Sequence, residues 1–293
     1  IRLPILRAER HQAGLHRAGR VHHRQREVAF LVTVQADDVA AGSHRHAADV
    51  DLGAGHERRP KVLAEPVGLA LELGEHAGVL AVADGLGGLP AGDQASFQVL
   101  SSLASAVNNH CGDMDAVRNS ILNGVEQADH TIASMGIGAA TTVSIVDIHG
   151  RDIRSYHVGD SMTLVTGQRG RIKYQTMPHS PVGYAVEAGI LDAEAAMHHE
   201  ERHLVSNVVG MPNMRVEIGP RFTLAARDTL LIGSDGVFDN LQIDEIVELI
   251  RKGPLLTAAE NLCLHCRARM THYEEGRPHT PDDMSFILYR PGQ

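Results

Sequence analysis

Short apolar runs, separated by turns that contain glycine, dominate the chain from about Val67 onward. The runs in GVLAVADG, GAATTVSIVDIHG, RDIRSYHVGDS, MTLVTGQRGRIKY and DTLLIGSDG are rich in β-branched and other apolar residues. Runs of this length, bounded by Gly, Asp and Ser, are typical of buried strands. The pattern predicts consecutive antiparallel strands, and DDMSFILYR near the end of the chain predicts one more.

Helical patterns lie between these predicted strands. AGDQASFQVLSSLASAVNN has an apolar residue at every fourth position, which predicts a helix over residues 91–109. IDEIVELIRKG predicts another helix, which stops at Gly253 and Pro254. Strands in antiparallel succession with a few helices between them indicate an α+β domain, because a parallel sheet would need strict alternation of strand and helix.

The segment 1–66 has a different character. It is rich in arginine and histidine, contains a single lysine, and shows no apolar period of 2 or 3.6 residues over most of its length. One candidate strand, VAFLVTVQ at 28–35, is the exception. We therefore expect residues 1–66 to be an atypical, poorly specified or disordered N-terminal segment, and residues 67–293 to be the folded catalytic domain.

Composition and charge exclude several classes of protein. The 293 residues are 43% hydrophobic, which suits a packed core, and carry a formal net charge of -9 without a Lys/Arg run that has interleaved aromatic residues. We therefore do not expect the protein to bind nucleic acid electrostatically. No stretch approaches 18 consecutive apolar residues, and IRLPILRAERHQ meets charge after a few positions, so we expect neither a membrane span nor a secretory signal. These observations predict a cytoplasmic protein.

Cysteine and histidine motifs give weak signals for metal or redox chemistry. Cys263 and Cys266 form a CxxC in a helical pattern, without a second pair to complete four zinc ligands, so two thiols facing the core are the expected arrangement. Cys111 is the third cysteine, and a set of three is too small and uneven to indicate a disulfide framework. HHEERH at 198–203 offers nitrogens for zinc, but a solvated polar segment is the favoured interpretation.

Acidic residues stand at four strand edges: Asp84, Asp160, Asp235 and Asp282. Asp84 precedes Gly85, Gly87 and Gly88, which by themselves indicate either a tight turn before the helix or a backbone cleared for a hard cation. If the strands pack in one sandwich, the four acids can converge, and their repulsion then requires cations. Oxygen ligands without Cys or His select Mg²⁺ or Mn²⁺.

The blocks VADGLGG, GAATTVSIV, YHVGDS, LLIGSDGVFDNL and DDMSFIL occur in this order between residues 79 and 290. Together they resemble the signature blocks of the protein phosphatase 2C family, the metal-dependent serine/threonine phosphatases, in a bacterial type. The resemblance implies a four-layer α-β-β-α sandwich, in which helices flank two packed antiparallel sheets. It also implies two Mn²⁺ or Mg²⁺ ions at one edge of the sandwich, with a third, weaker ion beside them.

The resemblance further implies a role for each acid. Asp84 matches the residue that bridges both ions, and Gly85 matches the residue whose carbonyl oxygen binds one of them. Asp235 and Asp282 match the two acids that complete the same metal, so these three aspartates are the expected catalytic residues. Asp160 matches an acid linked to the third ion. Asp283 takes a neighbouring position that is usually Asn, and the strand start at 141–142 is expected to be structural.

The activity implied by the resemblance is hydrolysis of phosphoserine and phosphothreonine in proteins by a hydroxide held at the two ions. The expected partners are phosphorylated proteins that are substrates of a serine/threonine kinase, and no nucleic acid or membrane. Family members carry an arginine and an Asn-Glu-Asp stretch upstream of the DGxGG block, where this chain has HERRPKVLAEP. The alternative is therefore a catalytically impaired binding or regulatory module that lacks the second metal.

Other positions bear on that alternative. Asp37 and Asp38 are acidic but lie about twice the usual distance upstream of Asp84, so no role is assigned to them, and Arg58 or Arg59 is a candidate for gripping phosphate. Leu86 stands where many eukaryotic members have a histidine. His179 is one candidate to protonate the leaving group in its place, and the sequence does not choose between it and a water. The segment 197–210 is expected to form a lid or scaffold.

Overall fold

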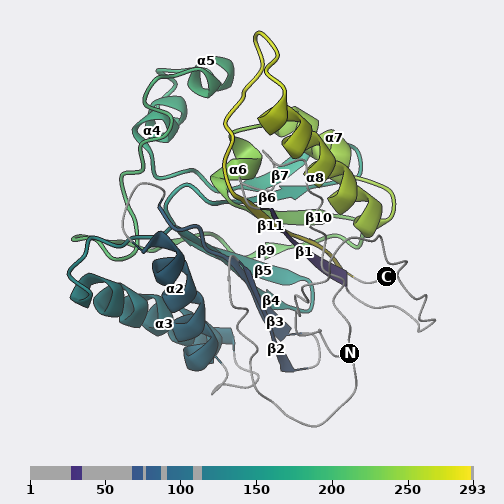
Figure 1. Ribbon diagram of the computed structural model, residues 1–293. Helices are drawn as coiled ribbons and strands as arrows, with labels where there is room; N and C mark the ends of the chain where they lie inside the picture. The colour runs from purple at the N-terminus through teal and green to yellow at the C-terminus, as the bar shows by residue number, and fades with distance from the viewer. Residues whose placement is uncertain (1–27, 35–67, 75–76, 87–90, 108–113, 292–293) are drawn as a thin grey trace, which may run out of the picture.

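The computed structural model describes residues 28–34, 68–74, 77–86, 91–107 and 114–291. Within them, two antiparallel sheets pack face to face and helices cover both outer faces (Figure 1). The α+β class and the four-layer sandwich are thereby confirmed. The first sheet has the order β1-β11-β10-β6-β7, and the second has the order β2-β3-β4-β5-β8, with β9 paired to β5.

The strands of the first sheet are β1 (Val28–Val34), β6 (Met162–Thr166), β7 (Ile172–Gln175), β10 (Thr229–Gly233) and β11 (Met284–Arg290). The strands of the second sheet are β2 (Gly68–Gly74), β3 (Ala77–Val82), β4 (Val143–His149), β5 (Asp152–Val158), β8 (Glu217–Ile218) and β9 (Phe222–Thr223). The helices are α2 (Gly92–Val107), α3 (Met114–Ser134), α4 (Pro181–Glu187), α5 (Ala193–Met197), α6 (Asp235–Phe238), α7 (Ile243–Ile250) and α8 (Leu255–Thr271).

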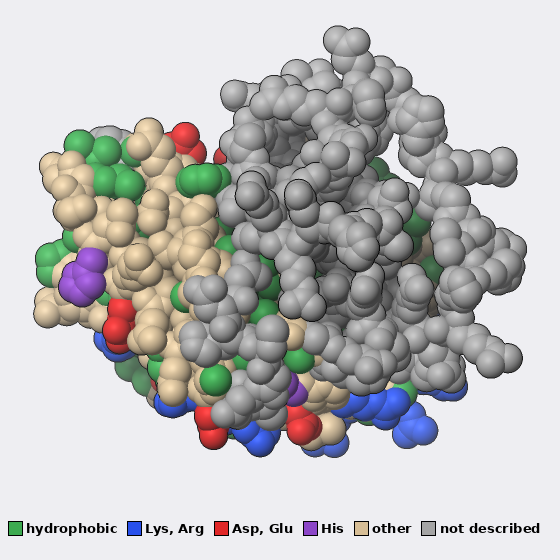
Figure 2. Space-filling model, turned by 90° about the horizontal axis from the view of Figure 1, so that it is seen from below, with side chains coloured by type: hydrophobic (Ala, Val, Ile, Leu, Met, Phe, Trp, Pro, Cys, Tyr) green, Lys and Arg blue, Asp and Glu red, His purple; other side chains and the backbone are tan. Residues whose placement is uncertain are grey.

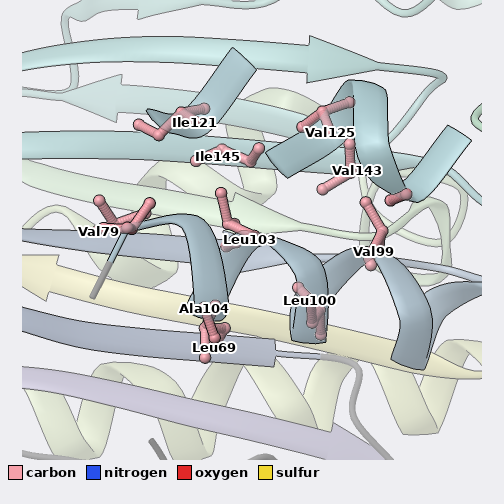
Figure 3. Close-up of a cluster of buried hydrophobic side chains, with 14 of the residues drawn as sticks. Leu69, Val79, Val99, Leu100, Leu103, Ala104, Ile121, Val125, Val143 and Ile145 are labelled. Atoms are coloured by element: carbon pink, nitrogen blue, oxygen red, sulfur yellow. The ribbon is translucent and has the colours of Figure 1, made fainter. Parts of the chain in front are cut away.

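Three apolar clusters separate the four layers. One lies between the sheets and includes Leu80, Val146 and Ile287. A second lies between the β2–β5 sheet and the helices α2 and α3, where side chains such as Leu103 and Ile145 meet (Figure 3). The third lies under α7 and α8, on the other sheet. Strands buried on both faces explain why their sequences are apolar runs rather than alternating ones.

The succession of strands differs from the sequence prediction at one point. β4 and β5 form an antiparallel pair, as do β6 and β7, but β5 and β6 belong to different sheets. The crossing follows Gly159, whose φ of +102° is a conformation that residues with a side chain rarely adopt. The glycine thus lets the chain pass from one sheet to the other instead of closing a third hairpin.

The candidate strand in the N-terminal segment is present. β1 pairs with β11 along its whole length, from Val28 opposite Arg290 to Val34 opposite Met284. It is therefore an edge strand of the first sheet. The remainder of residues 1–66 lies outside the described residues, so the domain boundary at 66 and 67 stays a prediction.

Both cysteines of the CxxC lie in α8, as expected. Cys266 is fully buried in the third apolar cluster, and Cys263 packs against the same cluster while partly exposed. Both are free thiols, and burial raises the pKa of Cys263 to about 11. The motif therefore contributes to the core, in agreement with the sequence interpretation.

The surface carries charges of both signs. On the face shown in Figure 2, basic and acidic side chains of the described residues lie next to one another along one edge, with apolar side chains scattered between them. Among the described helices, none has the length and hydropathy needed to cross a membrane.

Candidate metal centre

The four predicted acids occupy equivalent places in the fold, because each stands two residues from the end of a strand. Asp84 follows β3, Asp160 follows β5, Asp235 follows β10, and Asp282 precedes β11. β10 and β11 are antiparallel, with Gly233 opposite Phe286, so the end of one strand lies beside the start of the other. The same holds for the end of β5 and the start of β4, where Val158 faces Val143.

The structure brings all four acids together. The side chains of Asp84 and Asp235 lie within hydrogen-bonding reach of each other, and the negative charges of Asp282 and Asp160 also act on Asp84. The charges of Asp84, Asp160 and Asp282 act in turn on Asp235. Since Asp84 and Asp235 come from different sheets, the cluster lies across one edge of the sandwich.

Burial and mutual repulsion disfavour the charged forms of these acids. Burial, together with the neighbouring carboxylates, raises the pKa of Asp84 to about 7, although the hydrogen bond with Asp235 acts in the opposite direction. Burial and the charge of Asp239 raise the pKa of Asp160 to about 7. The pKa of Asp235 is raised well above its ordinary value, first by burial and then by Asp84. A cluster of this kind is stabilised by positive charge placed among the oxygens.

The turn after β3 is held by the start of β4. The carbonyl oxygen of Asp84 accepts two hydrogen bonds, from the Thr142 amide at 2.8 Å and from Thr141 Oγ1 at 2.7 Å. Leu86 donates its amide to the Ala140 carbonyl oxygen at 3.0 Å. Because both flanking residues turn their backbone groups toward residues 140–142, the Gly85 carbonyl points away from that segment. The structural role predicted for the strand start at 141–142 is confirmed.

Position 85 has no room for a side chain, because the Gly92 backbone lies against it. A Cβ atom on Gly85 would overlap the carbonyl group of Gly92, at the beginning of α2. The turn after β3 and the first residue of the helix thus approach too closely for any side chain at Gly85. Gly87 and Gly88 lie outside the described residues.

The turn around Asp235 is fixed in the same manner. The Ser234 amide donates to the Ser285 carbonyl oxygen at 2.8 Å, and the Ser285 amide donates to Ser234 Oγ at 3.1 Å. A Cβ atom on Gly236 would overlap the carbonyl oxygen of Asp283, so α6 and the segment before β11 are also in close contact. These contacts set the position of Asp235 relative to Asp282.

One acid of the cluster was missed by the sequence analysis. Asp239 lies one helical turn after Asp235, and its charge acts on Asp160, Asp235 and Asp282. It forms an ion pair with Arg202, whose Nη2 lies 2.8 Å from Asp239 Oδ1. The spacing of four residues in SDGVFDN was the available signal, since residues at i and i+4 share a helix face.

His179, one candidate to protonate the leaving group, lies away from that role. His179 is fully buried, and both of its ring nitrogens are engaged by groups of the protein, so it is not placed to protonate a leaving group at the acid cluster. Asp37, Asp38, Arg58 and Arg59 lie outside the described residues.

The donor set fits a divalent cation that prefers oxygen. Asp235 Oδ1 is buried and has no hydrogen-bond partner among the described residues. A buried carboxylate oxygen without a partner is costly, and metal coordination is a common way to satisfy it. Together with Asp84, Asp282 and a backbone carbonyl, this set contains oxygen only, the type of ligand that Mg²⁺ and Mn²⁺ bind.

An α-β-β-α sandwich with a carboxylate cluster at one edge is the architecture that the resemblance to the metal-dependent serine/threonine phosphatases implies. The family model described as protein phosphatase 2C matches residues 68–263, and the chain belongs to this family. The predicted family is therefore confirmed.

Individual relatives agree with this assignment. The protein phosphatase PhpP of Streptococcus pneumoniae is 28% identical over 195 residues, which are 63% of this chain and 77% of that protein. Among solved structures, the Streptococcus agalactiae serine/threonine phosphatase superposes with a TM-score of 0.70 at 23% identity. The match covers 91% of this chain and 100% of the Streptococcus agalactiae chain. The catalytic domain of the serine/threonine phosphatase PstP, solved with two manganese ions, has a TM-score of 0.60 at 19% identity and covers 90% of this chain and 99% of its own. The structural matches establish the fold.

Proposed function

We propose that this protein hydrolyses phosphoserine and phosphothreonine in proteins, with two Mn²⁺ or Mg²⁺ ions held by the acid cluster. The observation that carries the proposal is the convergence of Asp84, Asp235 and Asp282, which come from distant parts of the chain. Three buried or half-buried carboxylates cluster at a real cost in free energy, and cations offset that cost. The phosphorylated substrates would be those of a serine/threonine kinase.

Each residue has a distinct part in the proposal. Asp84 would hold both ions, and the Gly85 carbonyl, which points away from residues 140–142, would hold one of them. Asp235 and Asp282 complete the coordination of the same metal through carboxylate oxygens. Asp160 serves a third, weaker ion. These assignments rest on the correspondence with the family motifs and on the proximity of the acids to one another.

The chemistry divides between the ions and the chain. When bound, the divalent ions lower the pKa of a coordinated water and offset the negative charge of the phosphoryl group. The chain fixes the ligands beforehand: Thr141 and Thr142 hold the Asp84 carbonyl, and the Ser234–Ser285 hydrogen bonds hold the turn before Asp235. Arg202 offsets the charge of Asp239 at the side of the cluster. Such preorganisation matters because a displaced ligand changes both metal affinity and rate.

The test is hydrolysis of an aryl phosphate and of a phosphothreonine peptide with Mn²⁺ in the assay. We expect turnover that requires Mn²⁺, is abolished by chelator and falls at least about 100-fold in Asp84→Asn and Asp235→Asn, as removal of electrostatic stabilisation commonly does. Asp244→Asn, at an exposed acid in the first turn of α7, is the matched control and is expected to keep the activity. Turnover retained in Asp84→Asn would refute the proposed roles.

The second candidate function is a binding or regulatory module with an incomplete centre. The observation in its favour is HERRPKVLAEP, which stands where family members carry the arginine and the Asn-Glu-Asp stretch. Calorimetric titration with Mn²⁺ separates the two functions. Two tight sites per chain favour the enzyme, whereas one site or none favours the module.

A further inference from the structure

A groove of about 740 Å³ lies beside the acid cluster, between two segments that are far apart in the sequence. One wall is the segment 197–203 at the end of α5, and the other is the loop 273–280 between α8 and β11. Both walls lie at the top of Figure 1, where the loop rises beside α5. The volume falls within the range of roughly 300–1,000 Å³ that is typical of ligand sites.

The inner end of the groove belongs to the acid cluster. Asp239 lines the groove. Its charge acts on three of the predicted acids, Asp160, Asp235 and Asp282. The groove therefore leads outward from the place where the acid cluster would hold a phosphoryl group. A peptide whose phosphorylated side chain enters the cluster has its adjoining residues within reach of the groove, because an extended residue spans about 3.3–3.6 Å.

The loop 273–280 is held in place by its neighbours. Asn240 Nδ2 donates to the Thr280 carbonyl oxygen at 2.7 Å, and the Thr280 amide donates to Asn240 Oδ1 at 2.9 Å. His279 Nδ1 donates to the Arg269 carbonyl oxygen at 2.6 Å. This wall is therefore formed before any ligand binds, so that binding costs little ordering of the loop.

The arginines that line the groove are already paired within the protein. Arg202 Nη2 lies 2.8 Å from Asp239 Oδ1, and the Arg202 side chain is only 16% exposed. Arg277 forms ion pairs with Glu245 and with Glu274. These carboxylates offset both positive charges, so neither guanidinium is free to bind an anionic segment.

Two carboxylates and one aromatic ring of the groove remain open to solvent. Glu200 on one wall and Glu275 on the other are exposed, and neither forms an ion pair with another residue of the described part of the chain. Tyr273 is 72% exposed, and its ring meets that of His279 edge to face, with centroids 5.8 Å apart. Carboxylates attract lysine and arginine, and a tyrosine ring also binds such cations.

We propose that this groove binds the residues next to the phosphorylated side chain of the substrate and favours segments that contain lysine or arginine. The inference rests on the proposed function, because the phosphoryl group of the same peptide occupies the acid cluster. Glu200 and Glu275 form ion pairs with basic side chains from opposite walls, and Tyr273 offers its ring to one of them. The groove thus selects among phosphorylated proteins by the charge around the phosphorylation site.

The experiment measures kcat/KM for two phosphothreonine peptides, one with arginine and the other with glutamate on both sides of the phosphothreonine. The assay contains Mn²⁺ at pH 8, above the range in which histidines such as those at 198, 199, 203 and 279 ordinarily become charged. Each value is divided by the kcat/KM of the same protein for an aryl phosphate, which has no flanking residues. Changes at the acid cluster then cancel.

We expect the wild type to prefer the arginine peptide, chiefly through a lower KM. The preference should fall at least about threefold in Glu200→Gln/Glu275→Gln, as the loss of two exposed ion pairs implies. Tyr273→Ala should lower the value for the arginine peptide about twofold to fivefold. The matched control is Glu187→Gln/Glu194→Gln, which removes the same charge from exposed positions of α4 and α5 outside the groove and should keep the wild-type preference.

Equal values for the two peptides in the wild type overturn the inference. So does a preference for arginine that survives in Glu200→Gln/Glu275→Gln, because the selection would then come from elsewhere on the protein. If the aryl phosphate is not hydrolysed either, the proposed function fails. The affinities of the same two peptides, measured by fluorescence anisotropy in wild type and variants, then decide the inference by the same comparison.

Discussion

Thr141 Oγ1 donates a hydrogen bond of 2.7 Å to the carbonyl oxygen of Asp84, across 57 residues of chain. Thr141 is fully buried, and its backbone also pairs with Gly85 and with Val209. The contact joins the end of β3 to the start of β4 directly beneath the acid cluster. It is therefore a support for the backbone that carries both Asp84 and Gly85.

Replacing Thr141 by valine tests this support. Thr141→Val keeps the shape of the side chain but removes the donor, so the Asp84 carbonyl retains only the Thr142 amide. We expect the free energy of unfolding to fall by about 1–2 kcal/mol and Mn²⁺ to bind more weakly. Urea denaturation and calorimetry measure the two effects. The control is Thr131→Val, which removes an exposed hydrogen bond on α3 and should change neither quantity appreciably.

The glycine at position 85 gives a second prediction. In Gly85→Ala the new methyl group would overlap the Gly92 carbonyl, so the turn or the start of α2 must shift. We expect a loss of at least about 2 kcal/mol of stability, together with loss of Mn²⁺ binding, because backbone atoms cannot yield as side chains do. Gly167→Ala is the matched control, since the one close neighbour of its Cβ would be the flexible end of Lys173, with Asp228 Oδ1 and the Arg171 carbonyl oxygen at ordinary contact distances. A stable Gly85→Ala protein with intact metal affinity would contradict the account of this turn.

The buried Asp147 leads to a prediction that the stability of the protein depends on pH through a group outside the metal centre. It is buried on β4 and accepts a hydrogen bond of 2.6 Å from Tyr156 Oη. Burial raises its pKa above the ordinary value, although the hydrogen bond and nearby positive charges act against the rise. The folded protein thus holds a proton that the unfolded chain has lost. The stability from this group is complete below the unfolded pKa and falls as the pH rises through the folded pKa.

Asp147→Asn removes that titration. Relative to the wild type, we expect the variant to gain stability as the pH rises above the ordinary Asp pKa of about 4, in urea denaturation with chelator present. The acid cluster titrates in both proteins and cancels in the difference, since distant sites act additively. A stability difference between the two proteins that is constant with pH would be inconsistent with a raised pKa at Asp147. So would a difference that comes to favour the wild type as the pH rises.

The end of β1 suggests a source for the acid that family members carry in the Asn-Glu-Asp stretch and that HERRPKVLAEP lacks. Val34 pairs with Met284, two residues after Asp282, so the chain leaves β1 at the edge where the acids gather. Asp37 and Asp38 lie outside the described residues, but three or four residues span up to roughly 10–14 Å. We predict that Asp37→Asn or Asp38→Asn lowers the Mn²⁺ stoichiometry from two to one in a calorimetric titration. Two tight sites in the double variant would exclude both residues as ligands.

Much of the fold was predictable because its strands are buried on both faces. Apolar runs such as the one that forms β3 mark such strands clearly, and the candidate strand at 28–35, observed as β1 at Val28–Val34, was recognised by the same signal. The crossing at Gly159 was not predicted, because the local sequence is equally suited to a hairpin turn. Only the packing of the two sheets decides between these outcomes.

The candidate centre was predictable in part for a similar reason. Asp84, Asp160, Asp235 and Asp282 are marked by their position at strand ends, and the family motifs select them. Asp239 carries no such mark, since it is the C-cap of α6 and reaches the cluster through the register of that helix.

The central claim is that the acids at these strand ends hold divalent ions. Anomalous diffraction at the manganese edge, from crystals soaked in Mn²⁺, tests it most directly. We predict two strong peaks beside Asp84, one of them also within coordination distance of Asp235, Asp282 and the Gly85 carbonyl oxygen. Anomalous density that is absent from this edge of the sandwich, or that lies only at other residues, would contradict the account.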